Sequence, residues 1–340
     1  MFNKKLILLM ITALFCSVVS AQSISKTGTT SAKFLSIGVG PRANAMGGAF
    51  SAVANDASAI YWNPAGIASI TERQAIVTYT KLFVDINVDF GGFVLPAGNL
   101  GTFGLSFTAL NSGNMEVTTE DYPEGTGQTF SAASYCVAFS YARYLTEEFA
   151  FGFSVKYIQE TIFNSSATGI GFDVGTNFVT PFYGIKFASC ITNYGTKMQM
   201  TGDDLLIRHD PDETRAGNNA AVDAYYSTDY FDLPLKLQIG ISKDFKIMND
   251  QRLTLAVDAT HPNDNKQSVN VGGELAFFNN LIEFRGGYKS LFLDDTQEGL
   301  TLGVGLNYAA KNALAIEFDY SFQKYKYLDN VHSFGLILKF

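Results

Sequence analysis

The side chains that could do chemistry are few and far apart in this chain. Its three histidines, His209, His261 and His332, fall in loops or at the ends of expected strands. A hydrolase needs a serine or cysteine nucleophile with a histidine beside it as base, and no such pair can be assembled. We therefore expect no catalytic residues, no enzyme activity and no cofactor.

One segment, residues 194–232, is rich in carboxylates: Asp203, Asp204, Asp210, Asp212, Glu213 and Asp223. Clustered carboxylates outside a cell could hold Ca²⁺, but the spacing lacks the EF-hand pattern. A solvated acidic loop is the simpler interpretation, and we assign no metal site. The same segment carries apolar side chains, which indicate either a lid or a docking surface; they are Leu205, Leu206, Ile207, Tyr225, Tyr226, Tyr230 and Phe231.

The composition narrows the class of protein that could hold these residues. Charged residues make up 16% of the 340 residues and aromatic residues 14%, with 31 glycines. Soluble domains average nearer 25% charged residues, about half as many again as this chain has. Low charge without a long apolar run after the N-terminus favours a membrane β-barrel; a glycine-rich secreted β-sandwich or β-helix is the alternative.

The N-terminus predicts export from the cytoplasm. Lys4 and Lys5 precede an apolar stretch at residues 6–19, and small residues follow at 19–21. This pattern predicts a signal peptide at residues 1–21, with Gln22 first in the mature chain. Its removal takes two lysines and no acid, so the formal charge moves from −8 to −10, which argues against a nucleic-acid partner.

Alternation of apolar and polar residues runs through most of the remaining chain. It predicts fourteen strands, an even number as a closed bacterial barrel requires: residues 73–80, 86–95, 100–110, 129–144, 149–162, 168–180, 182–193, 233–245, 251–261, 267–277, 281–292, 299–308, 313–323 and 331–340. Cys136 and Cys190 fall in strands that are not neighbours. We expect them to be half-buried and free of a disulfide.

The two faces of the late strands differ in a way that a soluble protein does not explain. Leu300, Leu302, Val304, Leu306 and Tyr308 share one face, and polar residues or glycines take the other. A lumen lined by charge with lipid outside explains both faces, and it predicts four lumen carboxylates: Glu274, Glu283, Glu317 and Asp319. Aromatic residues near strand ends predict interfacial girdles: Tyr141, Tyr144, Tyr288 and Phe292.

The connections give an independent indication. The two long ones, residues 111–128 and 194–232, both follow odd-numbered strands, whereas connections after even-numbered strands are short. Short periplasmic turns and long outer loops are typical of such barrels. The terminal Phe340 resembles the signal read by the barrel-assembly machinery, so we expect that machinery and outer-membrane lipid as partners.

The stretch at residues 34–70 has neither strand periodicity nor enough apolar bulk for a core, and we expect it to fill the lumen as a plug. Asp56 predicts the N-cap of a helical turn at residues 57–60. The run Asn63-Pro64-Ala65-Gly66 predicts the turn that ends it. Trp62 and the Asn63-Pro64 turn are expected to brace the plug against the inner wall.

Arg42 is the only charged residue between Lys33 and Asp56. An unpaired guanidinium inside a lumen would be costly, which predicts a partner among the four lumen carboxylates. The alternative is that Arg42 lies at the periplasmic rim in water.

The run GVGPRANAMGGAFSAVANDASAIYWNPAGIA resembles the plug of FadL-like outer-membrane barrels, and more closely the PorV/PorQ family of the Bacteroidetes. The likeness rests on an Arg-Ala pair, Met46-Gly47-Gly48, the Asp-Ala-Ser-Ala helix start, and Asn-Pro-Ala-Gly after an aromatic. It implies a signal peptide at 1–21, a plug at 22–71 and an all-β transmembrane antiparallel barrel of about fourteen strands at 72–340.

The resemblance also implies two functions for a protein of the cell outer membrane. One is an accessory role in type IX secretion or surface display, with secretion components or exported proteins as partners; we favour it on the plug motif. The other is a FadL-like channel for uptake of hydrophobic small molecules.

Overall fold

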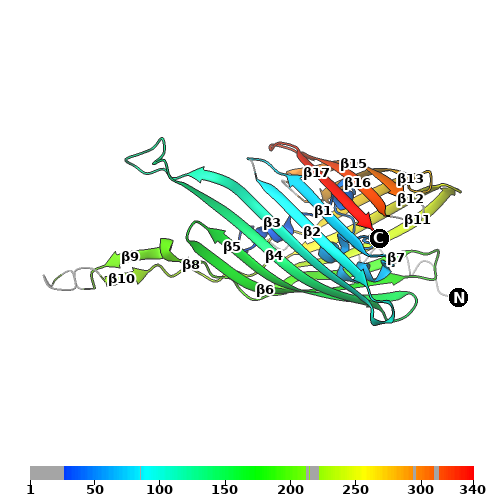
Figure 1. Cartoon of the computed structure of the whole chain (residues 1–340), viewed down its shortest axis with the longest axis horizontal. Helices are drawn as coiled ribbons and strands as arrows, with labels where there is room; N and C mark the ends of the chain where they lie inside the picture. The colour runs from blue at the N-terminus through cyan, green and yellow to red at the C-terminus, as the bar shows by residue number, and fades with distance from the viewer. Residues whose placement is uncertain (1–26, 85, 212–213, 215–221, 294–295, 310–313) are drawn as a thin grey trace, which may run out of the picture.

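The computed structural model describes residues 27–84, 86–211, 214, 222–293, 296–309 and 314–340, so the expected signal peptide and Gln22 lie outside it. Fourteen antiparallel strands form a closed barrel, because β1 pairs with β17 and β5 with β6 in one continuous ladder (Figure 1). The predicted closed barrel of fourteen strands is therefore confirmed. Its strands are β1 Gln74–Lys81, β2 Asn87–Pro96, β3 Thr102–Glu116, β4 Thr129–Tyr144, β5 Phe149–Ile162, β6 Ser165–Val179, β7 Lys186–Gly195, β11 Lys236–Met248, β12 Gln251–Pro262, β13 Ser268–Phe277, β14 Ile282–Leu291, β15 Glu298–Ala309, β16 Ala315–Tyr325 and β17 Val331–Lys339.

The predicted strand bounds agree with the structure to within three residues at every strand end except the start of β7 and the end of β3. β4 and β5 agree with the prediction at both ends. β7 begins at Lys186 rather than at residue 182, because Tyr183 and Gly184 adopt positive φ angles of 55° and 65° in a turn. β3 extends to Glu116, six residues beyond its predicted end.

The two faces of the wall behave as the alternation predicted. Leu302 and Phe318 point outward and are 48% and 46% exposed, whereas Glu274 points inward and is fully buried. Among the expected girdle residues, Tyr144, Tyr288 and Phe292 are exposed and Tyr141 is half-buried. Cys136 and Cys190 are free, as expected, but they are fully buried rather than half-buried, since both side chains point toward the lumen.

The rim of the barrel is uneven. β3 to β6 contain 14 to 16 residues each, whereas β1, β2, β13, β14 and β17 contain 8 to 10. The long strands rise well above the rest of the rim on one side (Figure 1). We call the end with the long connections the outer end, and the opposite end, where the C-terminus lies, the inner end.

The connection between β7 and β11 leaves the tall side of the rim and carries its own small elements. These are β8 Thr201–Gly202, the 3-10 helix η4 Asp203–Leu205, and a hairpin of β9 Leu206–His209 with β10 Val222–Tyr225. Asp204 fixes this segment to the β5–β6 turn by accepting hydrogen bonds from Asn164 N at 2.8 Å and Ser165 Oγ at 3.1 Å. The hairpin projects away from the barrel (Figure 1), so it does not itself cover the mouth, and Tyr225 at its end is exposed.

The N-terminal segment is folded inside the barrel. It contains η1 Lys33–Ser36, α2 Pro41–Ala45, α3 Ala59–Trp62 and η2 Pro64–Ser69; a further short 3-10 helix, η3 Gly98–Leu100, lies in the β2–β3 turn. α2 contacts β14 to β17 while η2 contacts β3 to β6, so the segment reaches opposite walls. No helix in the described part of the chain combines the length and apolarity needed to cross a bilayer.

One detail of the plug differs from the prediction. The helix expected at residues 57–60 begins two residues later, at Ala59. Asp56 still caps the turn before it, because its carboxylate accepts hydrogen bonds from Ser58 N at 2.9 Å and Ser58 Oγ at 2.5 Å. The local hydrogen bonds of Asp56 are satisfied by this turn, and the helix starts after it.

Candidate functional site

The plug is seated in places where the wall carries no side chains. A Cβ atom added at Gly287 would lie 2.4 Å from Gly47 N, and one at Gly272 would lie 2.3 Å from Met46 O. Gly303 leaves the same kind of space for Ala45. The turn itself needs Gly47 and the next residue, Gly48, because their φ angles are +67° and +75°. Together these wall glycines on β13 to β15 form a socket for the turn that follows α2.

Polar side chains of the wall hold the plug backbone. Asp258 on β12 is fully buried and accepts hydrogen bonds from Phe50 N at 3.0 Å and Ser51 N at 2.9 Å. Thr301 Oγ1 donates to Ala45 O at 2.8 Å. Sequence analysis missed Asp258, because its partners are backbone amides of a segment without periodicity.

The Asn63-Pro64 turn braces the plug against the opposite wall, as expected. Asn63 Nδ2 donates to Thr176 O on β6 at 3.1 Å and to Ser51 O within the plug at 2.9 Å. Pro64 packs where Gly152 lacks a side chain, since a Cβ there would lie 2.6 Å from Pro64 O.

Asn63 also begins η2, because its Oδ1 accepts from Ala65 N at 3.1 Å. Gly66 lies within this 3-10 helix, where a Cβ would be 2.3 Å from Ala54 O.

Trp62 does not brace the wall in the way expected. Its Nε1 donates to Val39 O at 2.8 Å, and its ring packs edge-on against Phe50 and Tyr61 at centroid distances of 6.1 and 5.3 Å. The indole is therefore held mainly by the plug itself. It also forms part of the floor of the outer cavity described below.

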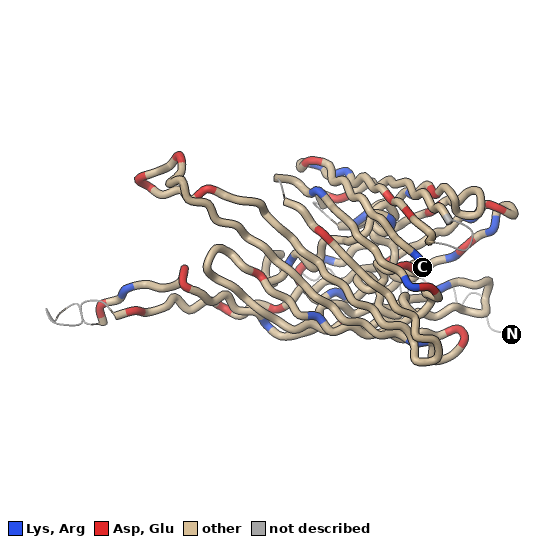
Figure 2. Tube along the Cα trace, viewed as in Figure 1, with Lys and Arg blue, Asp and Glu red and all other residues tan. Residues whose placement is uncertain are grey.

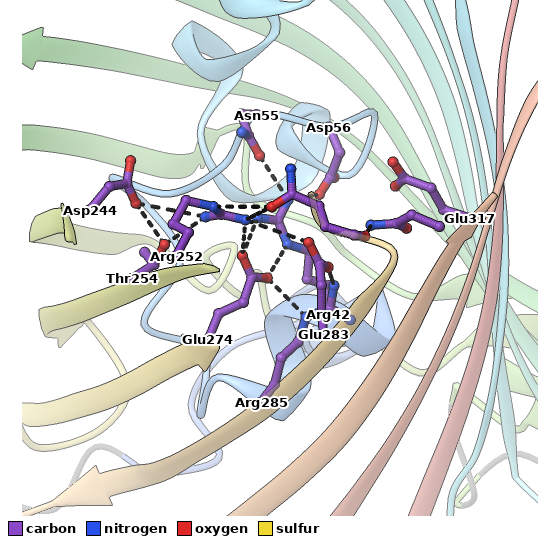
Figure 3. Close-up of polar contacts among 12 residues, drawn as sticks. Arg42, Asn55, Asp56, Asp244, Arg252, Thr254, Glu274, Glu283, Arg285 and Glu317 are labelled. Atoms are coloured by element: carbon purple, nitrogen blue, oxygen red, sulfur yellow. Dashed lines mark hydrogen bonds and ion pairs between the residues drawn. The ribbon is translucent and has the colours of Figure 1, made fainter. Parts of the chain in front are cut away.

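Arg42 has a carboxylate partner in the lumen, as predicted, and that partner is Glu274 (Figure 3). Arg42 Nε and Nη2 donate to the two Glu274 oxygens at 2.8 and 3.1 Å. Arg42 Nη1 donates to Asp56 at 2.9 Å and to Asn55 at 2.7 Å, both within the plug. The side chain is 12% exposed, so the alternative of a solvated rim position is wrong.

The other three expected carboxylates have different partners. Glu283 and Asp319 are ion-paired with Arg285, whose Nε also donates to Glu274 at 2.9 Å. Glu317 pairs with Lys339 and does not reach Arg42.

Arg252 completes the group by donating to Glu274 at 2.9 Å (Figure 3). We call Arg42, Asp56, Arg252, Glu274, Glu283, Arg285 and Asp319 the ion cluster. A polar cavity of about 290 Å³ borders Arg42 and Arg252 on the inner side of the plug.

A larger cavity of about 530 Å³ lies on the outer side of the plug. Its apolar lining comes from the plug, the wall and their connections: Phe34, Ile37, Trp62, Leu82, Phe83, Leu110 and Val331. Volumes of 300–1,000 Å³ are usual for sites that enclose a small molecule. The cavity is thus large enough for a ligand and faces the end at which the long connections emerge.

Lys236, at the start of β11, borders this cavity. Its Nζ lies 5.5 Å from the centre of the Trp62 ring. Among the described residues no carboxylate pairs with it, whereas the cavity's other lysines, Lys33 and Lys289, pair with Asp264 and Glu298, both at 2.5 Å. Lys236 therefore offers an unneutralised positive charge beside apolar surface. Sequence reasoning missed it, because a lysine at a strand end carries no signal by itself.

The remaining predicted residues have simple positions. Phe340 N donates to Arg73 O at 3.0 Å, and its ring is 54% exposed beside Phe93 on the outside of the barrel. His332 Nδ1 bonds to the Tyr320 hydroxyl at 2.8 Å, which is not a catalytic arrangement. Within the described residues no group of three or more potential ligands is placed to bind a metal, and Asp212 and Glu213 lie outside those residues.

Comparison with known proteins supports the architecture. A model of an uncharacterised protein family (UPF0164) matches residues 12–170, a little under half of the chain. No curated protein matches the chain.

Solved structures match over nearly the whole chain at low sequence identity. The Ralstonia pickettii toluene transporter TbuX is 15% identical, with a TM-score of 0.54 over 89% of this chain and 97% of its own. A Pseudomonas aeruginosa FadL homologue is 14% identical, with a TM-score of 0.54 over 88% and 97%. The Pseudomonas putida toluene transporter TodX is 12% identical, with a TM-score of 0.57 over 89% and 97%. With the closed fourteen-stranded wall and the internal plug, these likenesses show that the chain has the fold of the FadL-like β-barrels.

Proposed function

We propose that the protein is an outer-membrane channel that takes up small hydrophobic molecules bearing an anionic group. The observation that carries this proposal is the outer cavity, which combines apolar side chains with the unpaired ammonium of Lys236. An apolar body would pack against Trp62 and Phe34, and a carboxylate would neutralise Lys236. The likeness to toluene transporters and to a FadL homologue supports a transport role.

The plug fits this function because it separates the two cavities. The outer cavity holds Trp62 in its floor, and the polar inner cavity begins at Arg42. A ligand that entered from outside would have to move part of the plug to pass. The ion cluster is suited to such movement, because both sides retain ion pairs when the plug separates from the wall. Arg42 still pairs with Asp56 in the plug, and Glu274 still pairs with Arg252 and Arg285 on the wall.

Binding can be tested through Trp62, which is the only tryptophan in the chain. We expect a bromine-labelled dodecanoic acid to quench its fluorescence saturably in the purified barrel. Lys236→Met should weaken this binding about tenfold or more, since a hydrogen bond to a charged group contributes about 1.5–3 kcal/mol. Bromododecane, which lacks the carboxylate, should bind both proteins equally.

The matched control is Lys243→Met, because Lys243 lies over the Tyr183 ring at 5.1 Å and does not line the cavity. Absence of saturable quenching in the unsubstituted protein would contradict the proposal. If quenching is saturable, uptake of the acid into liposomes that contain the barrel will show whether the bound acid also passes through the barrel.

A second candidate is the secretion-associated accessory role, and the projecting β9–β10 hairpin favours it. Tyr225 at the end of β10 and Tyr226 directly after it are each more than 60% exposed. Acidic positions also mark the tip of the β3–β4 connection (Figure 2). Replacing residues 206–225 by a short linker should abolish surface display of exported proteins under this candidate, while quenching of Trp62 persists.

A further inference from the structure

Three buried polar side chains meet on consecutive strands, in the middle of β5 and β6 and beside the last residues of β7. Lys156 lies on β5, Asp173 on β6 and Asn193 on β7, and none is more than 4% exposed. Lys156 Nζ is 2.6 Å from Asp173 Oδ2 and donates a hydrogen bond to Asn193 Oδ1 at 2.8 Å. This group belongs neither to the ion cluster nor to the lining of the outer cavity.

Asn193 reaches Lys156 only because β7 breaks its alternation. Thr192 and Asn193 both point inward, and the β6–β7 register skips between Phe172–Tyr194 and Val174–Ile191. Asn193 adopts a φ of +61°, which asparagine tolerates better than most residues. β-Bulges of this kind re-aim side chains next to functional sites. Regular alternation would have pointed the Asn193 amide toward the lipid.

The orientation of the amide is fixed from both sides. Asn193 N donates to Asp173 Oδ1 at 2.7 Å, and Asn193 Nδ2 donates to Pro234 O at 3.1 Å. The carbonyl oxygen is thereby left facing Lys156. Since a C=O bond is about 1.2 Å long, Lys156 Nζ lies within about 4 Å of the carbonyl carbon. This distance is close to that of a reactive pair.

We propose that Lys156 and Asn193 join spontaneously in an intramolecular isopeptide bond, with Asp173 as the acid and base. Asp173 takes a proton from the Lys156 ammonium, and the neutral amine attacks the Asn193 side-chain carbonyl carbon. A C–N bond forms and the C–Nδ2 bond breaks as Asp173 passes its proton to the departing nitrogen. The attacking nitrogen gives its second proton to Asp173, which is left protonated. The products are one amide bond and one molecule of ammonia, and no oxidant or cofactor is required.

The surroundings favour this reaction. Cys136, Ile158 and Leu233 pack around the site in a buried apolar cluster, which excludes water from it. Asp173 Oδ2, 2.6 Å from Lys156 Nζ, is placed to accept a proton from it. A proton acceptor in contact with the amine then makes it a nucleophile. The bond would tie β5 to β7 beside the bulge, where the backbone ladder between β6 and β7 is interrupted.

Mass spectrometry of the mature protein tests the proposal directly. We expect the intact chain to be lighter by one ammonia molecule than its sequence requires. Trypsin does not cleave after an acylated lysine, so residues 144–186 should remain one peptide, branched to residues 187–197. Fragmentation should place the branch between Lys156 and Asn193.

Two variants and a control identify the chemistry. Lys156→Arg keeps the positive charge beside Asp173 but provides no amine that can be acylated, and it should restore the full mass. Asp173→Asn should do the same by removing the proton acceptor. Lys186→Arg is the matched control, because Lys186 pairs with Asp244 at 2.9 Å outside the site, and the linkage should persist.

A mass equal to the full sequence, together with separate linear peptides ending at Lys156 and Lys186, overturns the proposal and makes the three residues a structural hydrogen-bonded ion pair. This result depends only on the unsubstituted protein, so it does not require the variants to fold. A linkage that persists in Asp173→Asn would overturn the assigned role of Asp173.

Discussion

Replacing Arg42 by alanine separates the plug from the wall at one defined point. Breaking a buried ion pair by removing one partner costs about 3–5 kcal/mol when the remaining charge has no other partner. Here Glu274 keeps Arg252 and Arg285, each at 2.9 Å. Asp56 keeps its hydrogen bonds from Ser58. We therefore expect Arg42→Ala to lower the free energy of unfolding by only about 2 kcal/mol, the contribution of a charge-assisted hydrogen bond.

Glu274→Ala provides the contrast within the same cluster. Glu274 is the acceptor shared by Arg42, Arg252 and Arg285, and its removal leaves three guanidinium groups competing for the remaining carboxylates. We expect this variant to lose the full cost of about 3–5 kcal/mol. The Glu274→Ala loss is expected to be larger because Glu274 is the shared acceptor of three arginines, whereas the partners of Arg42 keep other contacts. The number of bonds that each residue makes does not set this order.

Urea-induced unfolding in lipid vesicles measures both losses, with the folded fraction read from mobility on unheated gels. Fluorescence of Trp62, which is held by the plug, reports release of the plug separately. Lys339→Ala is the control, since its pair with Glu317 is partly exposed and should contribute less than about 1 kcal/mol. An Arg42→Ala loss equal to or larger than that of Glu274→Ala would refute the reasoning about shared partners.

Three further predictions concern the plug and the location of the protein. Gly287→Ala should raise liposome permeability, because its Cβ would lie 2.4 Å from the plug backbone beside Met46. Gly286→Ala, with its nearest atom at 3.7 Å, should not raise it, and equal effects of the two variants would contradict the seating of the plug on the wall glycines. Pro64→Ala removes the fixed φ of the turn and should raise permeability or antibiotic sensitivity, and unchanged values in a folded barrel would mean that the turn does not gate. The chain should fractionate with the outer membrane and run differently when boiled, as a closed β-barrel is expected to. A periplasmic protein with heat-independent mobility would refute this.

The sequence predicted the wall well because lipid and lumen impose opposite demands on alternate residues. Leu302 and Thr301 are neighbours that face different solvents, and this contrast is visible in any strand that crosses the membrane. The same contrast placed Glu274 inward. It could not choose Glu274 over Glu317 as the partner of Arg42, since that choice depends on how far the plug reaches along the wall.

The interior of the plug was much less predictable. α2 and the socket for Gly47 have no periodic signal, because small residues pack by the absence of side chains rather than by apolar bulk. The bulge that turns Asn193 inward also escaped prediction, since alternation assigns each residue one face only. Lys236 and Asp258 became recognisable only from their neighbours in space.

The uneven rim makes the mouth of the barrel higher on one side than on the other. β4 is eight residues longer than β1, and a tilted strand rises about 2.5 Å per residue, so one side stands about 20 Å above the other. Sideways access to the outer cavity is therefore blocked on the side of β3 to β6. It is open on the side of the short strands, β1, β2, β13, β14 and β17. The β9–β10 hairpin stands on the screened side, where Asp204 fixes it. A protein docked on that hairpin would leave the low side free, so the two functions proposed above would not exclude each other on one barrel.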